Sequence, residues 1–118
     1  MRDRRTGTRT GAVLGAGVLA LTVAAPAAAQ TEIEQIGYAS PAITADYGWN
    51  EQGLVATQAA AEGVGAEVIV ADGLGYDDVA PSIRTLIEDG ADFVVAMASG
   101  YNVRAPEVAQ ETNVPVLV

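Results

Sequence analysis

The 118-residue chain contains no cysteine, no histidine and no lysine. Without cysteine it can form neither a disulfide framework nor a thiolate metal site, and it has no cysteine to carry a lipid. Without histidine and lysine it lacks the usual metal ligand, the usual general base and the Schiff-base nucleophile. Ser40 and Ser99 therefore have no histidine to activate them, and we predict no enzymatic activity, no cofactor and no metal site.

The first thirty residues differ in composition from the rest. "MRDRRTGTRT" holds four arginines, "GAVLGAGVLALTVAAP" is apolar, and small residues follow in "AAAQ". This layout predicts a signal peptide over residues 1–29, cleaved after Ala29. The apolar run falls short of the roughly 20 residues of a spanning helix, so an uncleaved anchor is the weaker alternative. The Arg4–Arg5 pair hints at twin-arginine export, but the residues after it fit general secretion better.

Once residues 1–29 are removed, the charge is strongly negative. Two arginines, Arg84 and Arg104, then stand against fourteen acidic residues, which gives a net charge of −12. Such a surface repels nucleic acid and anionic lipid, because both carry the same sign. We therefore expect a soluble exported protein that does not bind nucleic acid.

Strand-like and helix-like segments alternate through the remainder. The expected strands are residues 35–39, 67–71, 91–99 and 114–118, and the expected helices are residues 49–63, 78–90 and 103–113. The strands are rich in β-branched or continuous apolar residues, which is typical of a parallel sheet buried on both faces. The alternation predicts an α/β fold with a doubly wound parallel sheet.

Local signals set the ends of the two longer helices. Leu54 and Val55 lie at helical spacing in the first helix, and Gly63 is its expected stop. Pro81 fits only the first turn of the second helix, so that helix should begin near Asp78, and either Asp77 or Asp78 can cap it.

The last segment, "VPVLV", reads as a strand with nothing after it to cover it. A parallel sheet that ends in this way exposes an apolar face and an unpaired edge. We therefore expect residues 30–118 to be a partial N-terminal lobe of a longer protein. A small complete domain with a C-terminal edge strand is the alternative.

The candidate site lies at the C-terminal ends of the strands, where ligands meet sheets of this kind. Four of the six aromatic residues fall in these turns: Tyr47, Trp49, Tyr76 and Tyr101. Aromatic faces can stack on a flat ring, and Asp46 can accept hydrogen bonds from it. Asn50 opens a helix whose N-terminal amides favour acceptor groups. We predict a ligand site made of Asp46, Tyr47, Trp49, Asn50, Ser99, Gly100 and Tyr101.

Each residue also has a purely structural explanation, which the sequence leaves open. Trp49 could pack the helix start onto the sheet, Asp46 could cap the turn or the helix, and Asn50 could be the N-cap. Tyr76 could be a surface loop residue. The segment 99–101 could be only a tight turn, with glycine chosen for its backbone freedom.

The ordered set "IGYAS", "DYGWNEQG", "IRTLIEDGADFVVAMASGY", "PEVAQE" and "VPVLV" resembles the basic membrane protein, or PnrA-like, family of ABC transporter substrate-binding proteins. Asp46, Trp49 and Asn50 match an acid placed three residues before an aromatic–asparagine pair. Residues 86–101 and 107–109 match a second family segment. The likeness covers nearly all of residues 33–118.

This resemblance implies a type I periplasmic-binding fold, of which the chain supplies the first part of the N-terminal lobe. It also implies a monomeric periplasmic receptor that closes on a small ligand, commonly a purine nucleoside, and delivers it to an ABC permease in the membrane. Trp49 would be the base-stacking aromatic and Asp46 a polar contact. With only one wall of the site, we expect this chain alone to bind weakly or not at all.

Two features depart from the family pattern. Family members often carry an acid just after the Gly-Tyr pair, where this chain has Asn102 and Val103. Many members are lipoproteins, whereas this chain has no cysteine to acylate. The first departure leaves the identity of the nucleoside open, and the second favours a freely diffusing periplasmic protein.

Two other functions are compatible with an α/β fold. The first is a ligand-sensing domain of the same fold in a signalling receptor. The second is a flavodoxin-like redox domain, which needs a phosphate loop after the first strand. "SPAITADYGWN" offers Ser40 and Thr44 there, but also an acid and two bulky rings, which would repel and crowd a phosphate.

Overall fold

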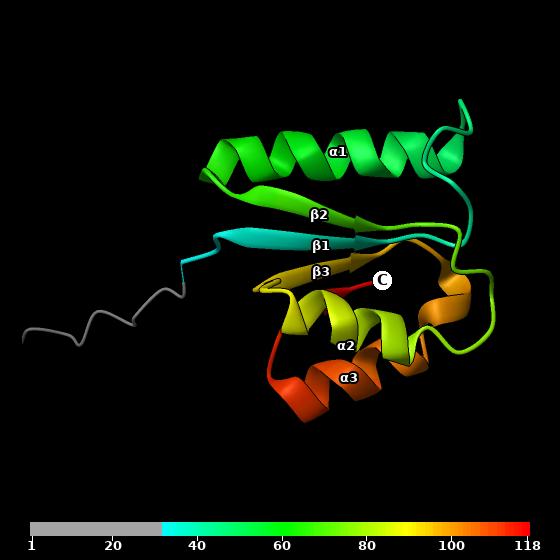
Figure 1. Cartoon of the computed structure of the whole chain (residues 1–118), viewed down its shortest axis with the longest axis vertical. Helices are drawn as coiled ribbons and strands as arrows, with labels where there is room; N and C mark the ends of the chain where they lie inside the picture. Colours follow the sequence, from blue (N-terminus) through cyan, green and yellow to red (C-terminus); the bar gives the residue numbers. More distant parts are fainter. Residues whose placement is uncertain (1–31) are drawn as a thin grey trace, which may run out of the picture.

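A computed structural model of the chain describes residues 32–118. The signal peptide expected over residues 1–29 lies outside the described residues. The elements alternate as expected (Figure 1): β1 (Gln35–Ala39), α1 (Trp49–Val64), β2 (Glu67–Ala71), α2 (Ala80–Glu88), β3 (Phe93–Ala96), the 3-10 turn η1 (Ser99–Tyr101), α3 (Arg104–Thr112) and β4 (Val116–Leu117).

The four strands form one parallel sheet in the order β2-β1-β3-β4. In the registers, Gln35 pairs with Glu67, Ile36 pairs with Phe93, and Val94 pairs with Val116. The chain moves outward from β1 to β2 and then returns to place β3 on the other side of β1. The predicted α/β, doubly wound parallel sheet is therefore confirmed, and the strand order reverses between β1 and β3.

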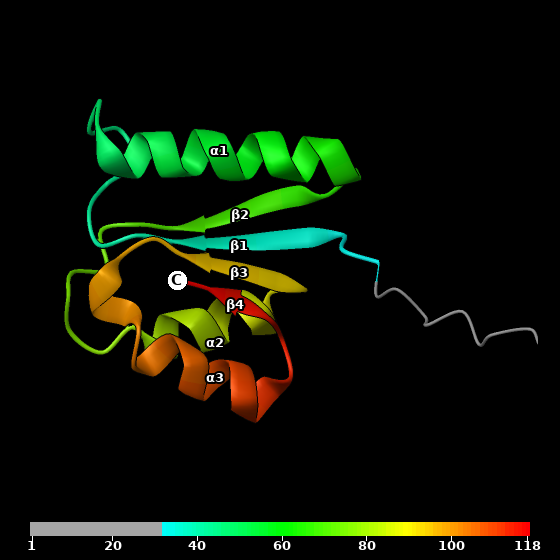
Figure 2. The same ribbon diagram turned by 180° about the vertical axis from the view of Figure 1, so that it is seen from behind.

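The helices cover the two faces of the sheet unequally. Figures 1 and 2 show α1 alone on one face, with α2 and α3 together on the other. The α2–α3 face holds the main core, in which Ile83, Leu86, Val94 and Val108 are buried. These side chains come from alternate strand positions and from one stripe of each helix, which is the pattern of a packed sheet–helix layer.

The α1 face is only partly covered. A groove of about 460 Å³ runs between α1 and the sheet, and its lining includes Ile36, Phe93, Val95 and Leu117. Its α1 side is made of small residues, among them Gly53. Leu117 in β4 is 57% exposed. The apolar face over β3 and β4 therefore lies open to solvent beside α1.

Helix α1 ends later than expected and packs through an unexpected face. It continues through Gly63 to Val64, and Gly65 adopts the left-handed conformation with φ of 76°. The prediction of Gly63 as the stop was wrong, because Gly65 supplies the turn that Gly63 was expected to supply. Val55 is exposed, whereas Gly53 and Thr57 face the sheet. These smaller side chains let the helix approach the strands closely.

The ends of α2 and β3 can also be compared with the expected segments. Pro81 lies in the first turn of α2 as expected, and Asp78 accepts a hydrogen bond from the Ala80 N–H at 3.1 Å. β3 is shorter than the expected strand over residues 91–99, because the chain leaves the sheet after Ala96 and forms η1. Within residues 32–118, none of the helices has the length and apolar character needed to cross a bilayer.

Candidate functional site

A crevice of about 360 Å³ lies where β1 and β3 end, at the point where the strand order reverses. Its lining comes from three turns that are distant in sequence: Trp49, Tyr76, Met97, Ala98 and Ser99. Trp49 begins α1, Tyr76 belongs to the loop between β2 and α2, and the other three residues follow β3. Parallel α/β sheets bind ligands at this position. The structure thus brings Trp49, Tyr76 and Ser99 of the predicted rim together.

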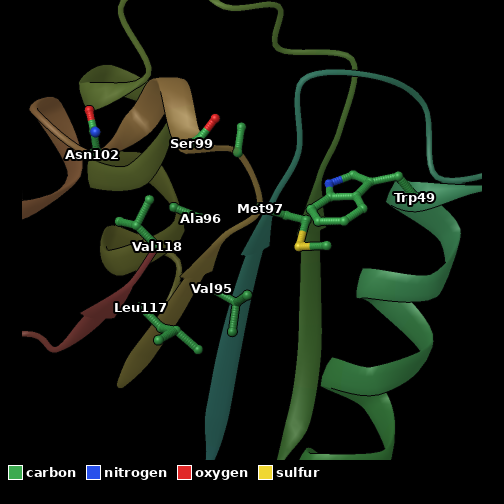
Figure 3. A pocket seen from close by; sticks show the side chains of 9 residues that line it. Trp49, Val95, Ala96, Met97, Ser99, Asn102, Leu117 and Val118 are labelled. Atoms are coloured by element: carbon green, nitrogen blue, oxygen red, sulfur yellow. The ribbon is translucent and has the colours of Figure 1, made fainter.

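A second cavity of about 550 Å³ adjoins the crevice on the side of β4 (Figure 3). Trp49, Met97 and Ser99 line both cavities, while Asn102 and Leu117 line only the second. The two cavities together form an open, largely apolar depression beside the Trp49 ring.

Trp49 is 68% exposed. Figure 3 shows its indole projecting from the start of α1 toward the residues that follow β3. Because most of the side chain is accessible, the ring is not a buried staple between helix and sheet. An exposed ring beside a cavity is available for stacking on a flat solute.

Asp46 acts as the cap of α1. One carboxylate oxygen accepts hydrogen bonds from the N–H groups of Gly48 (2.9 Å) and Glu51 (3.1 Å). The other accepts from the Asn50 N–H (3.2 Å) and from Asn50 Nδ2 (2.7 Å). The Asn50 side-chain hydrogen bond is the largest cause that lowers the pKa of Asp46 to about 2. A carboxylate has about four acceptor positions, so the expected direct contact of Asp46 with a ligand gives way to a structural role.

Asn50 is buried, with 7% of its surface exposed. Its Nδ2 group must face Asp46, because a carboxylate can only accept hydrogen bonds. Its Oδ1 atom therefore points elsewhere, and it is buried with no hydrogen-bond partner among residues 32–118. The Asn50 backbone oxygen accepts a hydrogen bond of 2.8 Å from the fully buried Tyr38 hydroxyl. Asn50 thus fixes the first turn of α1 and leaves one buried acceptor free.

Tyr47 and Tyr101 do not line the crevice. Tyr47 adopts the left-handed conformation with φ of 52°, and its ring is 94% exposed. Tyr101 is 1% exposed and donates a hydrogen bond of 2.6 Å to the Gly75 carbonyl oxygen. Burial raises the pKa of the Tyr101 phenol above its usual value. The expectation that the Tyr101 ring faces a ligand was wrong, because this ring belongs to the core.

Tyr76 and Gly100 pack against each other. A Cβ atom on Gly100 would lie 3.3 Å from Tyr76 Cδ1, so the ring rests on the glycine. The φ of Gly100 is not in the left-handed region, so close approach explains this glycine better than backbone freedom does. Tyr76 remains 73% exposed. Gly100 thus supports a wall of the crevice without contacting its interior.

Hydrogen bonds tie the loops around the crevice together. The Gly75 N–H donates to the Pro41 carbonyl at 2.9 Å. Asp72 accepts hydrogen bonds from both the N–H and the hydroxyl of Thr44, each at 2.8 Å, and these bonds lower the pKa of Asp72. Because the loops after β1 and β2 are joined in this way, the position of Tyr76 is fixed relative to β1.

Comparisons with known proteins support the fold assignment. No protein-family model and no curated protein matches the chain. Among solved structures, the chain is similar to an ABC transporter system solute-binding protein from Conexibacter woesei DSM 14684, with 23% sequence identity and a TM-score of 0.60. The similarity covers 70% of this chain and 27% of that one. The fold is shared with part of a solute-binding protein. This chain spans only about 27% of the length of that protein.

Sequence reasoning missed two residues of the crevice, Met97 and Ala98. Both were assigned to the interior of the third strand. In the structure the Met97 N–H donates to the Ala39 carbonyl at 2.8 Å, and the chain then leaves the sheet. The available signal was the position of Met97 near the C-terminal end of an apolar strand, where side chains reach the ligand edge of a parallel sheet.

Proposed function

We propose that this chain is part of the exported solute-binding component of an ABC transporter, and that it binds a purine nucleoside or a similar flat polar solute. The observation that carries the proposal is the crevice of about 360 Å³ at the reversal of strand order, with the accessible rings of Trp49 and Tyr76 in its lining. The shared fold with a solute-binding protein supports the transport role. An ABC permease is then the membrane partner and the periplasm the site of action.

The flat base lies against the Trp49 ring in this proposal. Offset stacking of aromatic rings contributes about 0.5–1.5 kcal/mol beyond the burial of surface. Tyr76 and Ser99 line the same crevice, and in this proposal their hydroxyl groups pair with polar edges of the base or the ribose. Asn50 and Tyr101 were both predicted to contact the ligand, but the structure buries them. In this proposal they hold the walls of the crevice in place.

The buried Oδ1 atom of Asn50 offers one further contact. A buried acceptor without a partner costs about 1–3 kcal/mol, so a donor that reaches it recovers that free energy. A ribose hydroxyl or a ring N–H is such a donor. It can reach Asn50 only if Trp49 or a neighbouring side chain moves, because the atom is buried.

The affinity of this chain alone should be low. The crevice is open and presents one wall, so a bound solute stays largely in contact with water. We expect a dissociation constant of about 1 mM or weaker, which corresponds to roughly −4 kcal/mol. Micromolar binding would contradict the proposal that a second lobe is needed to close the site.

A fluorescence titration tests the proposal, because Trp49 is the only tryptophan in the chain. Guanosine, inosine and adenosine should each change Trp49 emission in a saturable way, and ribose alone should not. A Tyr76→Ala variant should weaken the response, and Val55→Ala, on an exposed part of α1 away from the crevice, should not. A response to ribose equal to that of the nucleosides would refute base stacking on Trp49.

A further inference from the structure

Met97 has a position that the proposed function does not use. Its backbone is held at the end of β1 by the 2.8 Å hydrogen bond to Ala39. Its side chain lines the crevice, the cavity toward β4 and the groove beneath α1. Met97 and Trp49 line the crevice and the cavity toward β4 together (Figure 3). Met97 therefore stands between the crevice and the open apolar face of the sheet.

Gly53 makes room for this side chain. A Cβ atom at Gly53 would lie 2.7 Å from Met97 Cε and 2.9 Å from Met97 Cγ. The thioether thus lies directly on the backbone of α1, one turn after Trp49. A glycine inside a helix is unfavourable compared with alanine, so a packing reason is expected for it, and the Met97 side chain supplies one.

We infer that Met97 determines the specificity of the proposed site, by forming the wall that separates the crevice from the apolar groove. With this wall in place, a solute lies flat across the strand ends, against Trp49, and an apolar substituent has no direct path from the crevice to the groove beneath α1. Without it, the crevice and the groove of about 460 Å³ become continuous. Met97 thus disfavours flat solutes whose apolar extension would run beneath α1. This inference rests on the proposed function for the identity of the solute, but not for the existence of the wall.

The wall is tested in the full chain with Met97→Ala, with Met97→Leu as the variant that keeps most of the side-chain volume. Val55→Ala is the control, because Val55 is exposed on α1 and lines neither the crevice, the β4 cavity nor the groove. Two readouts need no nucleoside: acrylamide quenching of Trp49, and binding of the neutral dye N-phenyl-1-naphthylamine, a flat ring system with an apolar extension. Circular dichroism establishes that each variant is folded.

In Met97→Ala, Trp49 should be quenched more easily because one side of its ring loses its neighbour. The same variant should bind the dye roughly tenfold more tightly, because the joined cavities bury more apolar surface. Met97→Leu and Val55→Ala should behave as the wild type in both readouts. If Met97→Ala matches the wild type in both, or if Val55→Ala shows the same gain, Met97 is not the wall.

The nucleoside titration separates this inference from the proposed function. If the dye and quenching results hold while the wild type shows no response to nucleosides, the wall stands and the proposed solute is wrong. If nucleosides bind and Met97→Ala leaves quenching and dye binding unchanged, the solute class stands and the role of Met97 is refuted.

Discussion

Replacing Gly53 by alanine should destabilise the protein, although alanine is the better helix former. A Cβ atom at this position would lie 2.5 Å from the Tyr38 hydroxyl oxygen and 2.7 Å from Met97 Cε. The end of Met97 can move aside. Tyr38 cannot, because it is fully buried and its hydroxyl donates a 2.8 Å hydrogen bond to the Asn50 carbonyl.

The size of the effect follows from three contributions. Exchange of glycine for alanine inside a helix gains about 0.5–1 kcal/mol. Overpacking costs typically about 1–3 kcal/mol, and loss of the hydrogen bond of the buried Tyr38 hydroxyl costs about 1–3 kcal/mol more. Since relaxation will avoid part of these costs, we expect the free energy of unfolding to fall by about 1–3 kcal/mol.

Gly63→Ala is the matched control in the same helix. Gly63 has ordinary helical geometry, and a Cβ atom added to it would meet no other atom within 4 Å. This substitution should therefore raise the free energy of unfolding by about 0.5–1 kcal/mol. Urea denaturation followed by far-ultraviolet circular dichroism measures both variants. A Gly53→Ala protein as stable as the wild type, or more stable, would refute the close packing of α1 on Tyr38.

Three further substitutions test the site. Asp46→Asn should lower the urea midpoint at pH 6. The pKa of Asp46 in the folded protein is about 2, against a reference of 3.8, so the Asp46 carboxylate stabilises the fold fully above pH 3.8. The difference in urea midpoint between the variant and the wild type should therefore shrink as the pH falls toward 2. Tyr101→Phe keeps the buried ring but loses the bond to Gly75, and should lower the free energy of unfolding by about 0.5–1.5 kcal/mol in urea denaturation. Trp49→Ala should change stability by no more than about 0.5 kcal/mol, since the ring is mostly exposed, yet abolish nucleoside binding in equilibrium dialysis.

Each of these substitutions has an outcome that contradicts its reasoning. A pH-independent difference between Asp46→Asn and the wild type would show that the carboxylate does not cap α1 through its charge. An unchanged Tyr101→Phe protein would show that the bond to Gly75 is not needed. A Trp49→Ala protein that still binds nucleosides would place the site elsewhere.

The fold could be predicted from the sequence because its signals are local. The bounds of β1 and β2 match the expected strands residue for residue. β2 is a β-branched run, Val68–Val70, between Gly65 and Gly73, and β1 is followed closely by Pro41. The choice between Gly63 and Gly65 as the end of α1 was not local. It depends on where β2 must begin beside β1, which the Glu67 N–H to Glu34 carbonyl bond of 2.8 Å fixes.

The site could be predicted only in part. The sequence places a residue on the rim of the sheet but does not say where its side chain points. Tyr101 turns into the core because the Gly75 carbonyl is there to accept its hydroxyl, and Asp46 turns toward four donors in the first turn of α1. Met97 was missed because an apolar residue at a strand end looks like part of the strand. The direction of Tyr101 depends on a contact between distant segments, whereas Asp46 is held by donors only two to five residues away, in the capping role that the sequence also allowed.

The most direct test of the proposed site is a nuclear magnetic resonance titration of the ¹⁵N-labelled chain with inosine. If the crevice binds a flat solute, the largest shifts will fall on the Trp49 indole and on the amides of Tyr76, Ala98 and Ser99, and they will saturate only at millimolar inosine. If the shifts fall on the N-terminal ends of the strands, or if the Trp49 indole does not respond, the crevice is not the site.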